Sequence, residues 1–410
     1  MLDIRSTMQS SLIFNHFKQI THRQTTADRP ETNHYHTLNL LGLLILKKLA
    51  KNPDNCAKIG KTKNLIPKIV DFTTAVIPKL RHRSPIAGTD PEIQAAKRAL
   101  QVLKRLAGTT GRTGETLRRE ISEIVFTIGS IREILKHGGE DEILKPLQKL
   151  GLEIITHLAM DEAARESIGA TGGMMRELMR IFLDCGGLDG QVRVKAGEAL
   201  AMLVVDSGRN CGRVLSARQN LVARLVEEAG DSLVGVNARR ILTYLCAYGE
   251  AADDSRTRKE LIKAFPMVLN DAMFGTAKQL EASINFIVQI VRFMSPIEFV
   301  DELERVNILE SELIKRLVYT LQKYNYPSIT SPSIRRNVIE LSIWLMQFNE
   351  KCITLFRNHE MEKELQHVAD TTSDVECFVV FCGHVGLTRY GTTMATLIDT
   401  AWELLGKNIH

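Results

Sequence analysis

Two short stretches of the chain have residue types and spacings that could support chemistry. The segment 108–114, GTTGRTG, spaces its glycines like a phosphate-binding loop, but it lacks the Gly-Lys-Ser/Thr ending and a preceding strand. His359 and Glu360 resemble the start of a zinc-protease helix, yet the next histidine, His367, lies eight positions after the first instead of four. Neither stretch predicts catalysis, and we interpret 108–114 as a flexible connection between helices.

A metal site has no better support. Cys377, Cys382 and His384 are metal-ligand types, but four residues separate the two cysteines and a fourth ligand is missing. Free cysteines are usually buried as small apolar residues, so we expect these thiols to pack in a core. No nucleophile-elbow, kinase or dinucleotide-binding motif is present. The sequence therefore predicts a protein that is not an enzyme and has no cofactor or metal.

Composition indicates a folded helical protein. The 410 residues are 44% hydrophobic and 25% charged, with only 11 prolines and a net charge of +5. Seven scattered cysteines are typical of a reducing compartment rather than of a disulfide framework. No apolar run is long enough to cross a bilayer, and the chain does not begin with a secretory signal. We expect a cytoplasmic and/or nuclear protein without a transmembrane segment.

The positive charge is concentrated in one stretch. The segment 97–119 holds seven basic residues against one acid, Glu115, so it carries +6 while the remainder of the chain sums to −1. A field of one sign can steer an acidic partner. The same pattern is also typical of a solvated helix face followed by a loop.

A helical pattern recurs along the chain and defines the elements that would position any site. Apolar helices end repeatedly on the pattern apolar-x-x-apolar-small, a sign of internal repeats. Successive endings lie 57, 52, 45, 42, 45 and 54 residues apart, which fits a three-helix repeat with inserted loops. The six clear endings and a poorer seventh are Leu46–Ala50, Leu103–Ala107, Ile155–Ala159, Leu200–Val204, Leu242–Cys246, Ile287–Val291 and Leu341–Leu345.

The register extends upstream of each ending. The residue eight positions before it is small in all six clear copies, which lets neighbouring helices approach closely. The residue five positions before it is apolar in all six. The seventh copy departs from the pattern, with Asn337 and Glu340 at these two places. The small residues are Gly42, Ala99, Gly151, Ala196, Ala238 and Ser283, and the apolar ones are Ile45, Val102, Ile154, Ala199, Ile241 and Phe286.

The repeat resembles that of the armadillo superfamily. The segments 52–70 and 162–179 look like the family's first helix, a glycine break at Gly60 or at Gly172 and Gly173, and its second helix. The helices with the recurring endings look like its third helix. The resemblance covers 37–345, and the overall texture is similar to that of uncharacterised armadillo proteins of plants. It implies an all-α, right-handed superhelical α-solenoid.

The repeat pattern divides the chain into three parts. Residues 1–36 hold one short amphipathic helix at 12–20 and a loop, and are interpreted as a partial repeat. Residues 37–348 form the armadillo repeats, with loop insertions near 80–91, 108–114 and 324–332. Residues 349–410 form a degenerate capping repeat that ends in an amphipathic helix at 392–405.

The resemblance also implies which side chains line the concave groove, namely those six and two positions before each ending. Import adaptors of this family repeat Trp and Asn there, whereas this chain has no Trp at these positions, so binding of basic signals is disfavoured. Lys48, Lys104 and Arg105 make the first two repeats basic, and acids follow. The groove residues are Leu44 and Lys48, Gln101 and Arg105, Glu153 and His157, Glu198 and Met202, Arg240 and Tyr244, and Asn285 and Gln289.

These residues lead to an expectation for function. We expect a non-catalytic scaffold or adaptor whose groove binds extended or helical protein segments, acidic ones at the basic end. Arg105 and Tyr244 are the strongest candidates because Arg and Tyr are enriched at binding hot spots. Alternatives are nucleic-acid or acidic-partner binding through 97–119, or a regulatory arm of a ubiquitin-ligase or membrane-associated complex. Nucleic acid is disfavoured because the basic stretch is short and lacks interleaved aromatic residues.

Overall fold

The described residues are helices joined by turns. A computed structural model describes residues 32–82, 90–139, 141–184, 190–248, 255–379 and 390–406. Within these ranges no β-strand occurs beyond a single bridge residue, Phe378. The expectation of an all-α fold is confirmed. The helix predicted at 12–20 lies outside the described residues.

The helices follow one another in triplets. The first helices are α3 (Pro53–Lys61), α7 (Gly111–Glu123), α10 (Glu162–Ala170), α13 (Gly208–Ala217), α16 (Ser255–Ile262), α19 (Pro296–Arg305) and α22 (Glu350–Asn358). The second helices are α4 (Leu65–Ala75), α8 (Thr127–His137), α11 (Met174–Met179), α14 (Leu221–Ala229), α17 (Phe265–Phe274), α20 (Glu310–Lys323) and α23 (Met361–Thr371). The third helices are α2 (Thr32–Leu49), α6 (Pro91–Ala107), α9 (Lys145–Leu158), α12 (Gly190–Val204), α15 (Gly235–Tyr248), α18 (Ala277–Ile290), α21 (Ile334–Phe348) and α24 (Met394–Leu404).

Four short helices extend the triplets. The helix α5 (Ile77–His82) follows α4, and a π-helical turn, η1 (Arg180–Asp184), continues α11. Two 3-10 turns, η3 (Val291–Phe293) and η4 (Asp374–Cys377), follow α18 and α23. They change the length of a connection and leave the order of the triplet intact.

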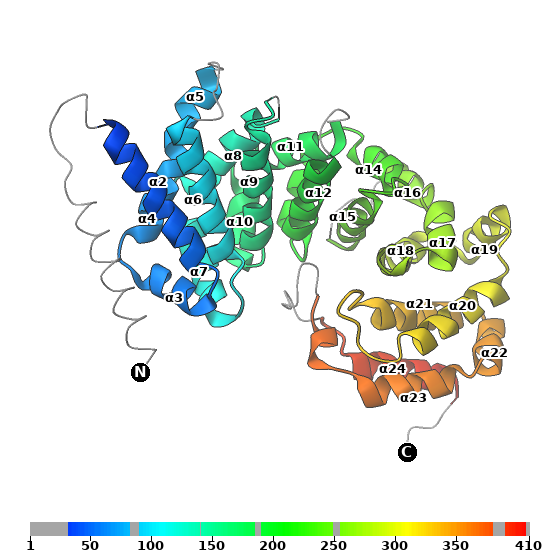
Figure 1. Ribbon diagram of the computed structural model, residues 1–410. Coiled ribbons are helices and arrows are strands. Elements are labelled where there is room, and N and C mark those ends of the chain that lie inside the picture. The colour runs from blue at the N-terminus through cyan, green and yellow to red at the C-terminus, as the bar shows by residue number, and fades with distance from the viewer. Residues whose placement is uncertain are drawn as a thin grey trace, which may run out of the picture.

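The third helices form one continuous row. Each packs against the next, from α2 through α6, α9, α12, α15, α18 and α21 to α24. Figure 1 shows the units stacked along a curved path, with the last units (yellow to red) turned back below the middle ones (green). Unit stacking of this kind buries a core that runs the length of the molecule. The segment expected to be a degenerate cap supplies a complete triplet, α22, α23 and α24.

The row is close-packed at the small positions predicted from the register. Ala99, Ala196, Ala238 and Ser283 are fully buried. A Cβ on Gly151 would lie 3.3 Å from Ile131 Cγ2, so no larger residue fits there without movement. The small position is therefore set by the contact between neighbouring helices.

The turn between first and second helices uses a residue with a positive φ angle. Asn64 has a φ of 61° and Gly173 a φ of 84°, and Asn220 and Glu360 hold the same place before α14 and α23. Asn and Gly tolerate this left-handed conformation best. The prediction of a break at Gly60 is therefore wrong, because the residue with positive φ is Asn64, four positions later. Gly60 lies inside α3, where a Cβ would lie 2.6 Å from Leu117 Cδ2.

Buried side chains from the next first helix satisfy the carbonyl groups at the ends of the third helices. The last residue of each recurring ending has a carbonyl without a helical partner. Cys56 Sγ donates to Ala50 O at 3.4 Å, and Arg165 Nε donates to Ala159 O at 3.0 Å. In the same way, Arg118 donates to Ala107 O and Cys211 donates to Val204 O. The repeated ending is thus a joint between units as well as a helix end.

The connection predicted at 108–114 is shorter than expected. The helix α7 begins at Gly111, which leaves only 108–110 between helices. Gly114 lies in the first turn of α7, and a Cβ there would fall 1.7 Å from Thr109 O. The glycines thus permit a tight corner between α6 and α7. The interpretation of this stretch as a flexible connection was wrong.

Two of the other predicted loops are also shortened by helix, and a third is not. The chain remains helical to His82 and resumes at Pro91, and 83–89 lie outside the described residues. Similarly, α2 begins at Thr32, inside the stretch expected to be a loop up to residue 36. The connection from Tyr324 to Ser333, between α20 and α21, is non-helical.

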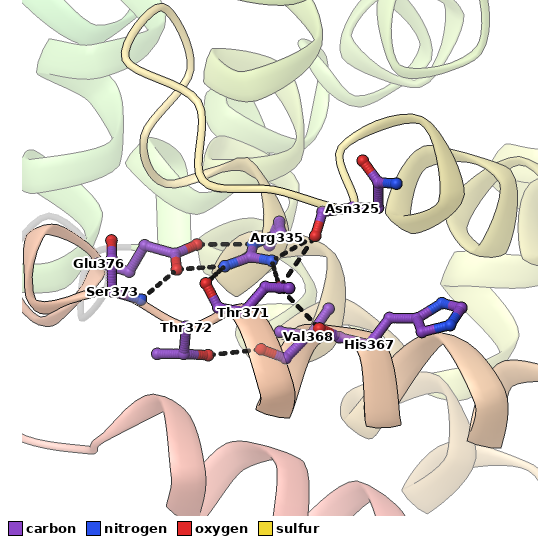
Figure 2. Close-up of polar contacts among 8 residues, drawn as sticks. All are labelled: Asn325, Arg335, His367, Val368, Thr371, Thr372, Ser373 and Glu376. Atoms are coloured by element: carbon purple, nitrogen blue, oxygen red, sulfur yellow. Dashed lines mark hydrogen bonds and ion pairs between the residues drawn. The ribbon is translucent and has the colours of Figure 1, made fainter.

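A buried ion pair joins α21 to η4, and its arginine also contacts the loop before α21 and the end of α23. Both side chains of Arg335 and Glu376 are 1% exposed, and Arg335 Nε donates to Glu376 Oε1 at 2.7 Å. Arg335 Nη1 also donates to Thr371 Oγ1 at 2.7 Å and to Asn325 O at 3.1 Å (Figure 2). Removing one partner of such a pair costs about 3–5 kcal/mol because the other charge is left buried.

Candidate protein-binding face of the third helices

The side chains predicted to line a groove lie on the row of third helices, and we call their surface the ladder face. Lys48 is exposed, and most of the others are half-buried. Three of the ladder residues are buried: Met202, Tyr244 and Gln289 are 1%, 7% and 9% exposed. The half-buried ones are Leu44, Gln101, Arg105, Glu153, His157, Glu198, Arg240 and Asn285.

The two ladder acids of the middle units are paired with lysines. Lys104 Nζ lies 2.7 Å from Glu153 Oε2, joining α6 to α9. Lys195 Nζ lies 2.7 Å from Glu198 Oε2, one turn apart on α12. Each carboxylate is therefore neutralised by a neighbour. The acids that follow the basic repeats therefore add no net negative charge to this part of the ladder face.

His157 lies where these charges meet. Burial lowers the pKa of His157, and the positive charges of Lys104, Arg118 and Lys195 lower it further, while Glu153 opposes the shift. The neutral imidazole is therefore the favoured form. In neutral His157 one ring nitrogen donates a hydrogen bond and the other accepts one, so the side chain adds polarity without charge.

The basic stretch 97–119 makes internal contacts. Arg98 Nη1 donates to Leu40 O at 2.5 Å, and Arg118, only 3% exposed, donates to two carbonyls at the end of α6. Lys104 pairs with Glu153, and Arg119 lies 3.6 Å from Asp161. Four of the seven basic side chains therefore already have a contact within the protein. These contacts argue further against the disfavoured alternative of nucleic-acid binding through 97–119.

The basic end of the ladder face retains two cations. Lys48 and Arg105 have no ion pair within the ranges that the structure describes, and they sit on the neighbouring helices α2 and α6. Gln101 lies one turn before Arg105 on the same helix. An acidic segment crossing α2 and α6 would meet positive charge and an amide together.

The C-terminal part of the chain packs on α21, the third helix that follows the ladder residues. The Tyr390 ring lies under the guanidinium of Arg336 on α21, with 3.9 Å between the guanidinium carbon and the ring centroid. Arg336 Nη2 also donates to Thr392 O at 2.6 Å, and the Tyr390 hydroxyl lies 3.4 Å from Ser333 Oγ. The segment 390–392 is therefore anchored on the beginning of α21.

Tyr244 is enclosed near this segment. Burial raises the pKa of Tyr244, and the nearby hydroxyl groups of Tyr390 and Tyr248 and the carboxylate of Asp206 act in the same direction. Its ring stacks with that of Tyr248 on the same helix, with 6.3 Å between centroids. Tyr244 was one of the two strongest candidates from sequence. In the structure Tyr244 is buried, whereas Arg105 is half-buried and keeps part of its side chain exposed.

Sequence reasoning missed Arg336 and Tyr390. The available signal was the polar run Arg335-Arg336-Asn337 within an otherwise apolar helix, which is also where the seventh repeat departs from the pattern. Asn337 is 2% exposed, and Arg336 Nε lies 3.1 Å from Glu340 Oε1. These polar groups are buried by the returning C-terminal part, which no repeat pattern predicts.

No metal site was found within the described ranges, where no group of three or more His, Cys, Asp and Glu residues is placed to hold an ion. His359 caps the end of α22 and His367 lies on α23, so they do not share a helix. Cys377 is half-buried, and Cys382 and His384 lie outside the described residues. None of the helices in the described part is long and apolar enough to cross a membrane.

Comparisons with known proteins bear on the fold. No protein-family model and no curated protein sequence matches the chain. Among solved structures, an engineered protein is similar at 16% identity with a TM-score of 0.52, over 89% of this chain and 78% of that chain. A second engineered protein is similar at 17% identity with a TM-score of 0.48, over 64% of this chain and 94% of that chain. A designed armadillo repeat protein is similar at 13% identity with a TM-score of 0.43, over 64% of this chain and 96% of that chain.

The first similarity shows a shared fold. Together with the helix triplets and the row of third helices, it confirms the fold class expected from the repeat pattern. This chain folds as an armadillo-like α-solenoid.

Proposed function

We propose that the chain is a non-catalytic scaffold that binds an acidic protein segment on the basic end of its ladder face. The observation that carries this proposal is the pair Lys48 and Arg105. Lys48 is exposed and Arg105 is half-buried on adjacent third helices, and neither has an ion pair among the described residues, whereas Lys104 and the ladder acids are already paired. The bound segment crosses α2, α6 and α9, and its carboxylates meet these two residues.

Chemistry and geometry favour a protein segment over nucleic acid. Two accessible cations beside an amide and a neutral imidazole suit a short acidic segment, whereas a nucleic-acid track needs many cations. Only three of the seven basic residues of 97–119 lack an internal contact among those described above. Tyr244 is buried, so the bound segment lies on the units before α15.

The location of the protein in the cell forms a second part of the proposal. Four of the five described cysteines are buried and all five are free thiols, which fits a reducing compartment. We therefore propose the cytoplasm and/or the nucleus. Imaging of a fluorescent fusion expressed at native level tests this.

The test of binding reverses charge at the basic end. A Lys48→Glu/Arg105→Glu double variant should lose the acidic partners that the unaltered protein captures in quantitative proximity labelling. A Lys315→Glu/Lys351→Glu variant is the matched control, because both lysines are exposed and the net charge changes equally. A partner set that is the same in both variants contradicts the proposal. Salt-sensitive retention on RNA that needs Lys48 and Arg105 would favour nucleic acid instead.

A further inference from the structure

A second concave site lies on the second helices. A cavity of about 470 Å³ is bounded by α4, α5 and α8 and the turn before α8, and no third helix lines it. Its volume is in the range of sites that hold a ligand or several side chains. It is therefore separate from the ladder face in both position and composition.

The cavity wall is mostly apolar and partly exposed to solvent. Val125 and Phe126, on the turn before α8, are 84% and 62% exposed, and Ile77 and Pro78 line the opposite side. Adjacent, strongly exposed apolar residues at the edge of a cavity are typical of interaction sites. Gly129 lies on the floor, where a Cβ would have no atom within 4 Å. The floor therefore has room for an inserted side chain.

The charged edge of the cavity has an excess of cations. Glu133 is 7% exposed, and it accepts hydrogen bonds from Arg81 Nε at 2.9 Å and from Arg132 Nη2 at 2.7 Å. Burial would raise the pKa of Glu133, but the hydrogen bonds from Arg132 and Arg81 outweigh burial and lower it. One carboxylate thus pairs with two guanidinium groups. The charged residues of the lining, Arg81, Arg132 and Glu133, therefore have a net charge of +1.

Of the two arginines, Arg81 is the one available to a ligand. Its side chain is 58% exposed, whereas the Arg132 side chain is 32% exposed and also donates to Gly172 O at 2.7 Å. A guanidinium has five N–H donors, and the contact with Glu133 uses one of those on Arg81. A second carboxylate can therefore bind Arg81 without displacing Glu133.

From these contacts we propose that the cavity is a docking site for a segment of a partner protein. The segment places one large apolar side chain between Val125, Phe126 and Ile77, over Gly129. A carboxylate of the same segment pairs with Arg81. Charge complementarity selects an acidic segment, and the apolar wall selects one that carries an aromatic or large aliphatic residue. The site is independent of the ladder face and gives the scaffold a second attachment point.

The test selects peptides from a phage-displayed random library on the purified full chain. A Gly129→Trp variant, whose indole fills the floor, serves for counter-selection. Peptides that bind the unaltered chain more tightly than Gly129→Trp should carry an aromatic or large aliphatic residue near Asp or Glu. Their binding to Gly129→Trp should be weaker by about tenfold or more. Failure to recover any such peptide, or recovery of basic ones, overturns the proposal.

Matched variants separate a blocked cavity from a damaged fold. Gly129→Ala should bind the peptides like the unaltered chain and unfold at the same or a higher denaturant concentration, because alanine favours helix. Arg81→Ala should weaken binding about two- to fivefold, the size expected of an exposed ion pair. Arg305→Ala removes a similarly exposed arginine that also faces a carboxylate, and it should change nothing. Equal loss in Arg81→Ala and Arg305→Ala overturns the role of Arg81.

Two further outcomes distinguish the alternatives. Peptides that bind Gly129→Trp normally but not the Lys48→Glu/Arg105→Glu variant belong to the ladder face and do not support the cavity. Sedimentation equilibrium tests for a second copy of the chain as the occupant. A concentration-dependent dimer that Gly129→Trp abolishes would replace the partner segment with self-association.

Discussion

His157 has surroundings that make its protonation unfavourable in the folded protein. Lys104, Arg118 and Lys195 are near enough to lower the pKa of its imidazole, and burial lowers it most. In the unfolded chain the pKa returns to about 6.5. The folded state therefore binds this proton less readily than the unfolded state does.

The pH dependence of stability follows from this difference. The contribution of neutral His157 is fully present above the unfolded pKa of about 6.5 and is lost as the pH falls towards the lower pKa of the folded state. The free energy of unfolding should fall by up to about 1.4 kcal/mol for each pH unit in that interval. Urea unfolding of the unaltered protein and of a His157→Gln variant, at a series of pH values, measures it. Identical pH slopes in the two proteins would contradict the assignment.

Among the helices, the joints between units depend on buried donors. Arg165 on α10 is 2% exposed, and it donates from Nε to Ala159 O at 3.0 Å and from Nη1 to Val205 O at 2.6 Å. These carbonyls end the consecutive third helices α9 and α12. One guanidinium therefore connects two units at their ends.

Replacing Arg165 should weaken this joint. An Arg165→Met variant keeps most of the side-chain volume but leaves both carbonyls without this donor. A buried acceptor left without a partner costs about 1–3 kcal/mol. The free energy of unfolding from urea titration should fall by at least that amount. Arg119→Met is the control, since Arg119 is 64% exposed and its contact with Asp161 is a surface ion pair worth at most about 1 kcal/mol. Equal destabilisation by both changes would show that the joint does not depend on Arg165.

The molecule as a whole is a stack in which each unit contacts its neighbours. The last third helix, α24, packs on α21 and α23, and its apolar residues Met394, Ile398 and Ala401 are buried. Because solenoid stability sums over unit interfaces, damage at one end should remain local at first. The segment 390–392, which precedes α24, is anchored on the beginning of α21.

A substitution at this end tests local coupling. Ile398→Asp places a charge at a position that is 2% exposed, so it should separate α24 from α21. Hydrogen exchange should accelerate in α21 and α23, while the amides of α6, α9 and α12 keep their protection. Asp399→Asn, a neighbouring change at a half-buried position, should leave exchange unchanged. Acceleration spread evenly over all third helices would mean that the stack unfolds as one unit.

The candidate site was predictable in part. The register predicted that Lys48, Gln101 and Arg105 lie on third helices away from the core, and the structure has Lys48 exposed and the other two half-buried, because a fixed helical phase relative to the buried positions fixes the exposed ones. It did not reveal that Lys104 pairs with Glu153, or that Tyr244 is enclosed. Both depend on which residues of other units come near. The cavity at Gly129 was also missed, since its lining comes from two units.

The sequence by itself determined the repeat and its stacking positions. At every interface between third helices the same position must hold a small side chain for the helices to approach closely. The small residues therefore recur in a pattern that can be counted along the chain. Only the tertiary structure decided which charges remain available. The contacts of Arg118 with carbonyls, of Arg336 with Tyr390 and of Arg81 with Glu133 join residues from different segments of the chain. Their pairing depends on distances between units, and a repeat pattern carries no information about those distances.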